Sequence, residues 1–329
     1  MTDNLVMGLD LGGTKTAAGI VSSQGRLLSH VRLPTPAKGV MRDLAALFDA
    51  AHAAVAATRV AWSRIRAIGV GVPGAVDPQS ETVWAPNLPG WLKVPLKQLV
   101  ESALQRPTFV EGDRNVQALA EMWLGVGAKR RVRNLVFLTV GTGIGAGLIA
   151  DGRPIAGAHG VSGAAGWMVI ERTWEAEYKD RGCFETLCAG DALTRLAVRG
   201  PRKGLLTRLA RKSAGRVTAE TVAAAARRGD KAARQALTEV GTNLGLGVAS
   251  IVSLLNPEVV VIGGGLAAIG RPLLTPLRKA LRQWGQPLAT KQVQVVRSCL
   301  GDEAGILGAA RYALLKVEET VRESAVRSG

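Results

Sequence analysis

Runs of apolar residues that meet glycine-rich turns recur along the chain. The runs are Leu5–Asp10, Ala17–Val21, Asn134–Val140 and Leu148–Ala150, and the turns that join them in pairs are Gly12–Thr16 and Gly141–Gly147. Short apolar runs bounded by glycine are typical of buried β-strands. The same strand, turn, strand unit thus occurs once in each half of the chain, which predicts two related α/β domains.

Apolar residues at intervals of three and four positions predict helices in the rest of the chain. The segments with this spacing are Met41–Thr58, Asn115–Leu124 and Leu237–Leu255. Asn256 and Pro257 are expected to end the last of these helices. A further strand is predicted at Ile65–Val72, and another, Glu258–Ile262, leads into the glycines Gly263–Gly265.

Three glycines lie inside the last predicted helix, at positions 241, 245 and 247. Each costs a helix about 1 kcal/mol relative to alanine, so something must compensate. Close approach of a nucleoside and close packing of the helix on a strand would both do so. The sequence leaves both interpretations open.

The length of the chain allows two domains, and its net charge favours anionic ligands. The chain has 329 residues, of which 47% are hydrophobic and 4% aromatic, a size that accommodates two domains. Lys and Arg number 42 against 26 Asp and Glu, and the net charge of +16 favours anions such as nucleotides, polyphosphate or nucleic acid. Basic residues gather at Lys129–Arg133 and Arg199–Arg216, where a solvated face is the simpler interpretation. Because the second stretch has no aromatic residue to stack on bases, no specific nucleic-acid partner is expected.

Cysteine content and the first residues favour a soluble cytoplasmic protein. Cys183, Cys188 and Cys299 are too irregularly spaced for a disulfide framework or a CxxC metal site. The N-terminal segment lacks the basic stretch and the apolar run of a signal peptide. The most apolar stretch, Leu244–Leu255, is shorter than the ~20 residues of a membrane helix, so no membrane partner is expected.

The glycine turns and two carboxylates carry the candidate chemistry. A glycine turn leaves backbone N–H groups accessible to a polyanion, so each turn is either a phosphate cradle or a simple tight hairpin. Gly141–Gly147 matches neither GxGxxG nor the P-loop pattern, which disfavours a dinucleotide fold. Asp10 is a candidate Mg²⁺ ligand, directly or through water, or a turn-capping residue. Asp113 is a candidate general base for phosphoryl transfer, or the N-cap of the helix that follows it.

An ordered set of motifs resembles the ROK family of sugar kinases, repressors and related proteins. The matching segments are Asp10–Lys15, Gly71–Gly74, Asn87–Trp91, Glu111–Asn115, Gly141–Gly147, Asn256–Gly265, Asp302–Gly305 and Gly308–Ala310. The resemblance covers nearly the whole chain. It implies an α/β protein with the two-domain actin-like, ribonuclease H-like ATPase fold and an interdomain cleft. It places residues 1–118 and the closing segment 303–329 in a small domain and residues 119–302 in a large one.

The same resemblance implies which residues form the site. ATP and Mg²⁺ are expected at Asp10, Gly12, Gly13, Thr14, Lys15, Gly141, Thr142, Gly143, Gly264 and Gly265. The sugar or polyol substrate is expected at Gly74, Asn87, Gly112, Asp113, His159 and Glu185. Within these sets Asp10 is the Mg²⁺ ligand and Asp113 the general base. Because dimers are common in the family, a homodimer is expected.

Three sugar contacts of the family are absent. Gly112 replaces an asparagine, Ala164 a glutamate and Trp167 a histidine. Because a site that bonds a hydroxyl discriminates through its own polar groups, their loss relaxes or redirects specificity. His159 replaces an asparagine and is either a new polar contact or an exposed loop side chain. For Trp167 we favour filling of the space left by a missing zinc-binding segment over stacking on a sugar or cyclitol.

The zinc motif of the family is degenerate in this chain. Trp167 stands at the histidine position, and Ala176 and Tyr178 stand at two cysteine positions. A structural zinc needs about four nitrogen or sulfur ligands, and Cys183 alone cannot supply them. We therefore expect no structural zinc.

The leading hypothesis is an ATP-dependent and Mg²⁺-dependent kinase that phosphorylates a hydroxyl of a sugar, as a glucokinase-like hexose kinase does, or of a sugar-like polyol. Polyphosphate as donor and a cyclitol as acceptor are variants of it. A non-catalytic sugar sensor or scaffold with the same fold is the alternative of another class. A repressor is disfavoured, because Asp10 of the first phosphate motif comes too early in the chain to leave room for a DNA-binding domain.

Overall fold

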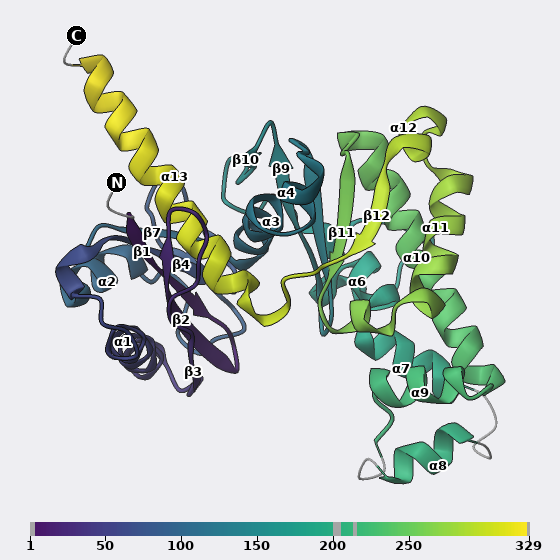
Figure 1. Cartoon of the computed structure of the whole chain (residues 1–329). Coiled ribbons are helices and arrows are strands. Elements are labelled where there is room, and N and C mark those ends of the chain that lie inside the picture. The colour runs from purple at the N-terminus through teal and green to yellow at the C-terminus, as the bar shows by residue number, and fades with distance from the viewer. Residues whose placement is uncertain (1–3, 200–204, 213–215, 328–329) are drawn as a thin grey trace. The chain divides into compact units, whose positions relative to one another are not determined.

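The computed structural model describes residues 4–199, 205–212 and 216–327 (Figure 1). Within these residues, the strands form two five-stranded sheets and a two-stranded ribbon. Part of the basic stretch Arg199–Arg216, including Arg202 and Lys203, lies outside the described residues.

The two five-stranded sheets share one strand order. The first has the order β3-β2-β1-β4-β7 and consists of β1 (Leu5–Leu11), β2 (Lys15–Ser22), β3 (Val31–Pro34), β4 (Ile65–Val72) and β7 (Thr108–Gly112). The second has the order β10-β9-β8-β11-β12 and consists of β8 (Leu135–Val140), β9 (Ile144–Ala150), β10 (Arg153–Pro154), β11 (Val259–Gly263) and β12 (Gln294–Arg297). The ribbon consists of β5 (Ala75–Val76) and β6 (Val83–Trp84). In each large sheet the last two strands in the order are parallel to the strand before them. The internal repeat expected from the glycine turns is confirmed by this matching order.

The described residues also form α-helices. They are α1 (Val40–Ala56), α2 (Leu96–Leu104), α3 (Asp113–Trp123), α4 (Val126–Arg130), α5 (Tyr178–Arg181), α6 (Cys183–Cys188), α7 (Gly190–Val198), α8 (Leu205–Lys212), α9 (Ala219–Arg227), α10 (Lys231–Leu255), α11 (Arg271–Trp284), α12 (Pro287–Gln292) and α13 (Ala304–Arg327). Short 3₁₀ turns are Trp62–Arg64, Ala165–Trp167, Gly265–Ile269 and Gly301–Glu303.

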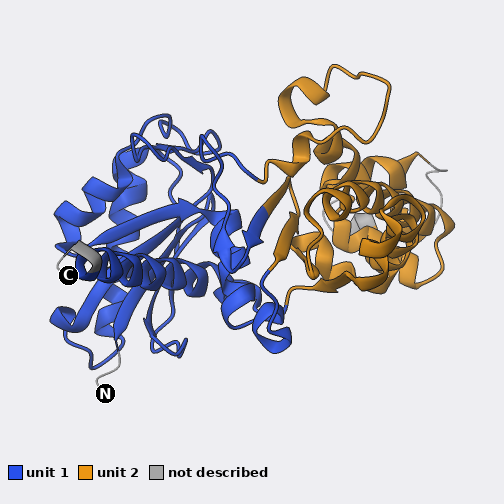
Figure 2. Cartoon of the chain, turned by 90° about the horizontal axis from the view of Figure 1, so that it is seen from above, with its two compact units in different colours: residues 1–133, 147–162, 299–329 blue, residues 134–146, 163–298 orange. Residues whose placement is uncertain are grey.

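The chain forms two compact units. Unit 1 comprises residues 1–133, 147–162 and 299–329, and unit 2 comprises residues 134–146 and 163–298 (Figure 2). The domain boundaries at 118/119 and 302/303 stay a prediction.

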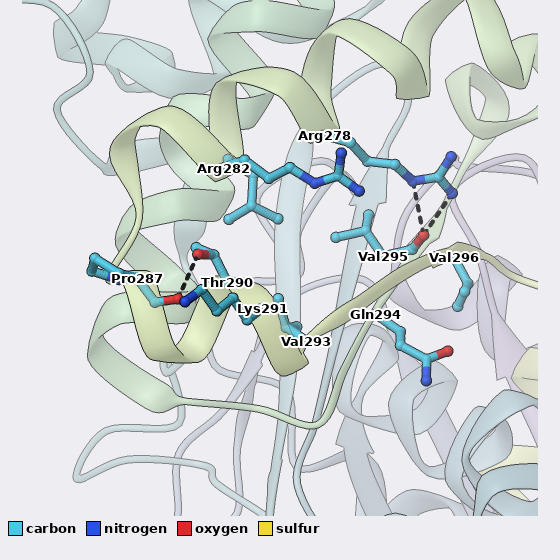
Figure 3. Close-up of a pocket in the computed structure, with 10 residues that line it drawn as sticks. Arg278, Arg282, Pro287, Thr290, Lys291, Val293, Gln294, Val295 and Val296 are labelled. Atoms are coloured by element: carbon cyan, nitrogen blue, oxygen red, sulfur yellow. Dashed lines mark hydrogen bonds between the residues drawn. The ribbon is translucent and has the colours of Figure 1, made fainter.

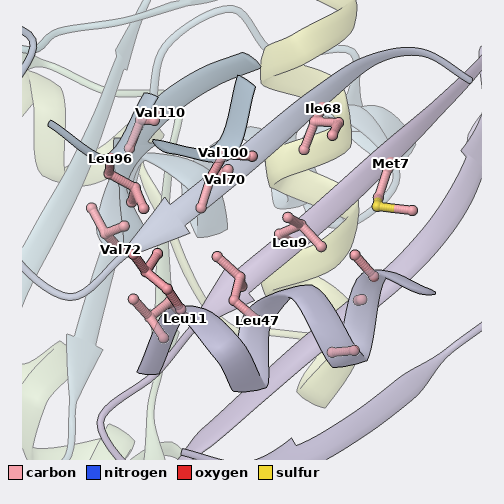
Figure 4. Packing of buried hydrophobic residues seen from close by; sticks show 14 of the residues in the cluster. Met7, Leu9, Leu11, Leu47, Ile68, Val70, Val72, Leu96, Val100 and Val110 are labelled. Atoms are coloured by element: carbon pink, nitrogen blue, oxygen red, sulfur yellow. The ribbon is translucent and has the colours of Figure 1, made fainter. Parts of the chain in front are cut away.

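The core of unit 1 follows from the alternation of side chains along its strands. Leu9 and Leu11 of β1 point to the face that α1 covers, where Leu47 and the β4 residue Val72 meet them (Figure 4). Val6, one residue out of phase, lies in the cluster that α13 covers on the other face. Because successive strand residues face opposite sides, β1 is buried on both faces.

Glycines let α13 approach the first sheet closely. A Cβ added at Gly8 of β1 would overlap the Ile306 carbonyl oxygen, and one at Gly69 of β4 would overlap the Ala309 carbonyl oxygen. A Cβ at Gly308 of α13 would overlap the Val116 carbonyl oxygen of α3. The helix backbone therefore rests directly on the sheet and on α3, and any side chain at these glycines would push it away.

We expect Gly69→Ala to lower the free energy of unfolding by about 2 to 3 kcal/mol, because overpacking a rigid backbone contact costs that much. Gly13→Ala is the matched control, because a Cβ there meets nothing within 4 Å. Urea denaturation followed by circular dichroism measures both variants. Equal stability of Gly69→Ala and wild type would contradict the packing described for α13.

Helix α10 is longer than its apolar pattern suggested. It begins at Lys231 because the Asp230 side chain accepts a hydrogen bond from the Ala233 amide at 3.0 Å, and it ends where Asn256 adopts a φ of 43°. Its 25 residues make it the one described helix long and apolar enough to span a membrane by length and composition alone. However, 56% of its apolar window is buried inside the protein, as in the core helix of a soluble fold.

The glycines of α10 serve helix–helix packing. Added Cβ atoms at Gly241 and Gly245 would clash with α11, at Pro276 and at the Leu277 carbonyl oxygen. One at Gly247 would overlap the Phe184 ring of α6. Close packing was one of the two expected explanations, but the packing partners are the helices α11 and α6 rather than a strand, because residue spacing alone does not reveal which element packs there.

Candidate active site

The first glycine turn joins β1 to β2, and Thr35 holds it from outside the hairpin. The Thr35 hydroxyl donates to the Gly12 carbonyl oxygen at 2.8 Å, and the Thr35 amide donates to the Thr14 carbonyl oxygen at 3.0 Å. In the part of the chain that the structure describes, the amides of Gly13 and Thr14 have no hydrogen-bond acceptor, and both residues are exposed. The turn therefore presents N–H groups to solvent, as an anion site requires.

The second turn, between β8 and β9, is held in the same way. The Gly141 carbonyl oxygen accepts the Gly190 amide at 2.8 Å, and the Gly143 carbonyl oxygen accepts the Gly141 amide at 3.0 Å. The Thr142 carbonyl oxygen accepts Nη2 of Arg181 at 2.8 Å. Within the described residues, the amides of Thr142 and Gly143 donate to no acceptor. This turn also presents amides rather than carbonyl groups.

The third predicted glycine segment lies beside the second turn. A Cβ added at Gly141 would lie 3.7 Å from the Gly265 amide nitrogen. Gly264 has a φ of 78° and no room for a Cβ against the Val140 carbonyl oxygen. Unit 2 thus brings together glycines predicted to bind the nucleotide that lie about 120 residues apart in the chain.

Glu185 of α6 also contacts the second turn. Its Oε2 accepts the Ile144 amide at 2.7 Å, and its Oε1 lies 3.1 Å from Nε of Arg181. The Glu185 side chain is 20% exposed, so part of the carboxylate still faces solvent. The residue expected to bind the sugar is therefore anchored to the turn expected to bind phosphate.

Asp10 is the penultimate residue of β1 and lies in a crowded, half-buried position. A Cβ added at Gly305 of α13 would overlap its carboxylate, and one at Gly71 would lie 3.4 Å from its Oδ1. Burial, and then the negative charge of Asp113, raise the pKa of Asp10 to about 7, against a smaller lowering effect of Arg32. No hydrogen-bond donor for this carboxylate lies among the described residues. An unpartnered buried carboxylate is a strong candidate for a cation ligand.

Asp113 is the first residue of α3, not its N-cap. The N-cap is Gly112, which has no side-chain cap bond, so the capping interpretation of Asp113 is wrong. Burial raises the pKa of Asp113, while the charge and the backbone amide of Arg114 lower it. Glu111, buried beside it, accepts the Gly112 amide at 2.8 Å and Nδ2 of Asn115 at 3.2 Å. These bonds fix the junction between β7 and α3, from which the Asp113 carboxylate projects.

The other residues of unit 1 that the sequence predicts for the acceptor lie around the β5–β6 ribbon. A Cβ added at Gly112 would lie 3.0 Å from the Gly74 carbonyl oxygen, and one at Gly74 would overlap the Trp84 carbonyl oxygen. One at Gly160 would overlap the Val76 carbonyl oxygen, which places the His159 loop at the ribbon. His159 and Asn87 are both exposed. The segments of Gly74, Gly112 and His159 therefore meet at the ribbon, and the Asn87 segment follows the ribbon in the chain.

A family comparison decides what this arrangement belongs to. The model of the ROK family matches residues 6–316. The chain belongs to the ROK family. A glucokinase of Streptomyces coelicolor is 34% identical to it over 321 residues, which cover 94% of this chain and 97% of the relative.

Solved ROK structures share the fold. A ROK hexokinase from Thermus thermophilus has a TM-score of 0.77 and 35% identity, with 96% of this chain and 99% of that chain covered. A ROK family glucokinase from Streptomyces griseus, solved in complex with glucose and AMPPNP, has a TM-score of 0.74 and 30% identity, with 94% and 99% covered. The expected two-domain actin-like ATPase fold is confirmed by these similarities and by the two related sheets.

The segment where ROK proteins carry a zinc motif has other contacts in this chain. Tyr178 and Cys183, at two ligand positions of the motif, are both buried. Trp174 meets the Tyr178 ring edge to face at 5.9 Å between centroids. Trp167 is 56% exposed, so the expectation that it fills interior space was wrong.

Sequence reasoning missed the residues that hold this ROK site in shape. Thr35 ties the first turn, Arg181 and Gly190 tie the second, and Gly305 packs on Asp10. Gly305 and Arg181 lie inside segments that resemble family motifs, so position was a usable signal for them. Thr35 lies in no motif, and only its tertiary contact reveals it.

A basic groove of about 630 Å³ lies elsewhere in unit 2, among α11, α12 and β12 (Figure 3). Arg278 donates from Nε and Nη2 to the Val295 carbonyl oxygen, at 3.3 and 2.7 Å. These bonds occupy an acceptor on the edge strand β12, which protects that edge from pairing with another chain. Arg282 and Lys291 also line the groove, but no residue predicted for the site does.

Proposed function

We propose that this ROK protein is a carbohydrate kinase that transfers the γ-phosphoryl group of ATP to a hydroxyl of a hexose or a sugar-like polyol. The observation that carries this proposal is the pair of half-buried carboxylates in unit 1, Asp10 and Asp113, in which the negative charge of Asp113 helps to raise the pKa of Asp10. The similarity to a glucokinase and to a ROK hexokinase along nearly their whole lengths supports a hexose as acceptor.

Asp113 would act as the general base. A carboxylate whose pKa is raised by burial takes up a proton more readily than an ordinary aspartate. It would accept the proton of the substrate hydroxyl as that oxygen attacks the γ-phosphorus and the bond to the β-phosphate oxygen breaks. Most of the remaining rate enhancement in phosphoryl transfer comes from positioning and charge stabilisation.

The exposed amides of the two glycine turns would bind the phosphate oxygens of ATP. Gly13 and Thr14 of the first turn and Thr142 and Gly143 of the second present these amides, and Lys15 adds a positive charge. Preorganised N–H groups stabilise charge without having to reorganise during the reaction.

Asp10 fits a Mg²⁺ ion, which would neutralise phosphate charge. Its carboxylate is half-buried and has no hydrogen-bond donor among the described residues, so its oxygen lone pairs are available to a cation. No group of three or more acidic, His or Cys side chains suited to a metal occurs in the described residues. Mg²⁺ commonly binds through one or two carboxylates, with water and phosphate oxygens completing its shell. We therefore propose that Asp10 holds it directly or through water.

The acceptor would be held by the residues that the sequence predicts for it, which are Asn87, Gly74, Gly112, His159 and Glu185. Because Gly112 and Ala164 offer no polar side chain, specificity would be broader than in ROK kinases that have both contacts. A cyclitol acceptor remains within this proposal, and the charge of +16 keeps polyphosphate within it as a donor.

A coupled assay of ADP formation tests the function. Purified protein with ATP and Mg²⁺ should form ADP with at least one of glucose, mannose, glucosamine or myo-inositol, far faster than with water alone. Replacing ATP by polyphosphate identifies the preferred donor. Absence of turnover across the panel, with AMPPNP still bound, would overturn the kinase proposal.

The loss of the polar groups at positions 112 and 164 specifically favours a second candidate, a non-catalytic sugar sensor. Such a protein would be stabilised thermally by a sugar without consuming ATP. Thermal melting with and without each sugar, in parallel with the turnover assay, separates the two candidates.

We further propose a cytoplasmic homodimer that contains no structural zinc and binds neither a specific nucleic acid nor a membrane. Only Cys183 remains as a zinc ligand at the motif positions of residues 167–183. One zinc per chain in elemental analysis would contradict the absence of a structural zinc. A monomer in sedimentation equilibrium would contradict the homodimer.

A further inference from the structure

Arg181 joins two groups of the candidate site in unit 2, the second glycine turn and Glu185, and it also contacts the exposed carboxylate of Asp191 outside that site. Its Nη2 donates to the Thr142 carbonyl oxygen at 2.8 Å, its Nε to Oε1 of Glu185 at 3.1 Å, and its Nη1 to Oδ2 of Asp191 at 2.9 Å. The side chain is 29% exposed, so solvent reaches only part of it. A planar guanidinium with three oriented bonds holds its partners more rigidly than an ammonium group could.

The bond to Thr142 determines where an amide of the phosphate turn points. The peptide between Thr142 and Gly143 is trans, like every peptide in the described residues. In a trans peptide the carbonyl and the N–H group point in opposite directions. By holding the Thr142 carbonyl group on one side, Arg181 directs the Gly143 amide to the other side, where it has no protein acceptor among the described residues.

Glycine would not hold this orientation by itself. Thr142 is exposed and Gly143 has no side chain that could brace it, so the peptide would be able to rotate. A Cβ at Gly143 would lie 2.7 Å from Oε2 of Glu185, so packing forbids a bulkier residue there. Rigidity must therefore come from hydrogen bonds, and Arg181 donates to both the turn and Glu185.

We propose that Arg181 is a positioning residue for phosphoryl transfer, which aims the Gly143 amide at a phosphate oxygen of the donor and links that amide to Glu185 on the acceptor side. This inference rests on the proposed kinase function and adds a residue whose side chain need not touch either substrate. Loss of Arg181 would leave the amide present but misdirected.

Steady-state kinetics of Arg181→Lys and Arg181→Gln, corrected for active-site concentration, test the proposal. We expect kcat to fall about tenfold to a hundredfold in both, somewhat less than when an oxyanion-stabilising donor is removed altogether. The KM for ATP should change less than about threefold, because the other turn amides remain. Thermal stabilisation by AMPPNP with Mg²⁺ should shrink, while stabilisation by adenosine should not.

Asp191→Asn is the matched control. Asp191 is 64% exposed, and its substitution alters the outer contact of Arg181 while leaving the bonds to Thr142 and Glu185. We expect its kcat within about twofold of wild type. A merely structural role would lower the melting temperature of the Arg181 variants without changing kcat per folded enzyme, and that result would overturn the proposal. Wild-type kcat in Arg181→Lys would overturn it too, whereas an inactive wild type would overturn the kinase function itself.

Discussion

Asp113→Asn is expected to lower kcat by about 10²- to 10⁴-fold, the range that general bases contribute. Asparagine has nearly the same shape but cannot accept the proton of the attacking hydroxyl. Because Gly112 rather than Asp113 caps α3, the helix should persist, and the free energy of unfolding should change by less than about 1 kcal/mol. The variant should still bind AMPPNP, because the turn amides are unchanged.

Rapid-mixing measurements of sugar phosphate formation with Asp113→Asn and wild type decide this prediction. Asp49→Asn is the control, because Asp49 is an exposed carboxylate of α1 in the same unit, and it should retain wild-type kcat. If Asp113→Asn turned over at the wild-type rate, Asp113 could not be the base. A variant that failed to fold would be recognised by its circular dichroism spectrum, and Asp113→Glu, which retains the carboxyl group, would then be compared at low temperature.

The strands and the glycine turns were predictable because their signals are local. The predicted strand Ile65–Val72 coincides with β4, and the β1 run was correct to within one residue. Apolar runs between glycines have few alternatives to a buried strand. The matching order of the two sheets followed from the repeat of one short unit in the sequence.

The residues that contact the glycine turns could not be predicted from local sequence patterns. Thr35 is 23 residues from Gly12 along the chain, and Arg181 is 39 residues from Thr142, so no local pattern links them. The neighbour of a helix glycine is equally non-local, which is why the partner of α10 was misassigned. Trp167 was misjudged because a large apolar residue is usually buried, whereas this one is mostly exposed.

Asp10→Asn is expected to lower kcat/KM for ATP by about 10²- to 10³-fold and, at the same time, to stabilise the protein at alkaline pH. The loss of activity follows from the removal of the proposed Mg²⁺ ligand, since metal stabilisation of phosphate charge is worth several kcal/mol. The gain in stability follows from burial, because the ionised carboxylate has no hydrogen-bond donor among the described residues. The two effects have opposite signs, which distinguishes a functional residue from a structural one.

The raised pKa of Asp10 determines at which pH the Asp10→Asn variant is more stable than wild type. Burial, and then the Asp113 charge, raise the pKa of Asp10 from its ordinary value of 3.8 to about 7 in the folded protein. Below pH 3.8 the group is protonated in both states, so wild type and variant should be equally stable. Between pH 3.8 and about 7 the unfolded chain loses this proton more readily, so the stability of wild type falls relative to the variant as the pH rises.

At pH 8 and without Mg²⁺ we expect Asp10→Asn to be roughly 2 kcal/mol more stable than wild type, about half of what the pKa shift would give at about 1.4 kcal/mol per unit, because solvent reaches this half-buried group. Urea denaturation at pH 5 and at pH 8 measures the difference. Added Mg²⁺ with AMPPNP should close the gap by stabilising only wild type, because the ion then partners the carboxylate that the protein leaves unpaired. A variant that is less stable than wild type at pH 8 would mean that Asp10 is held by contacts that need its charge, and the metal assignment would then lose its physical basis.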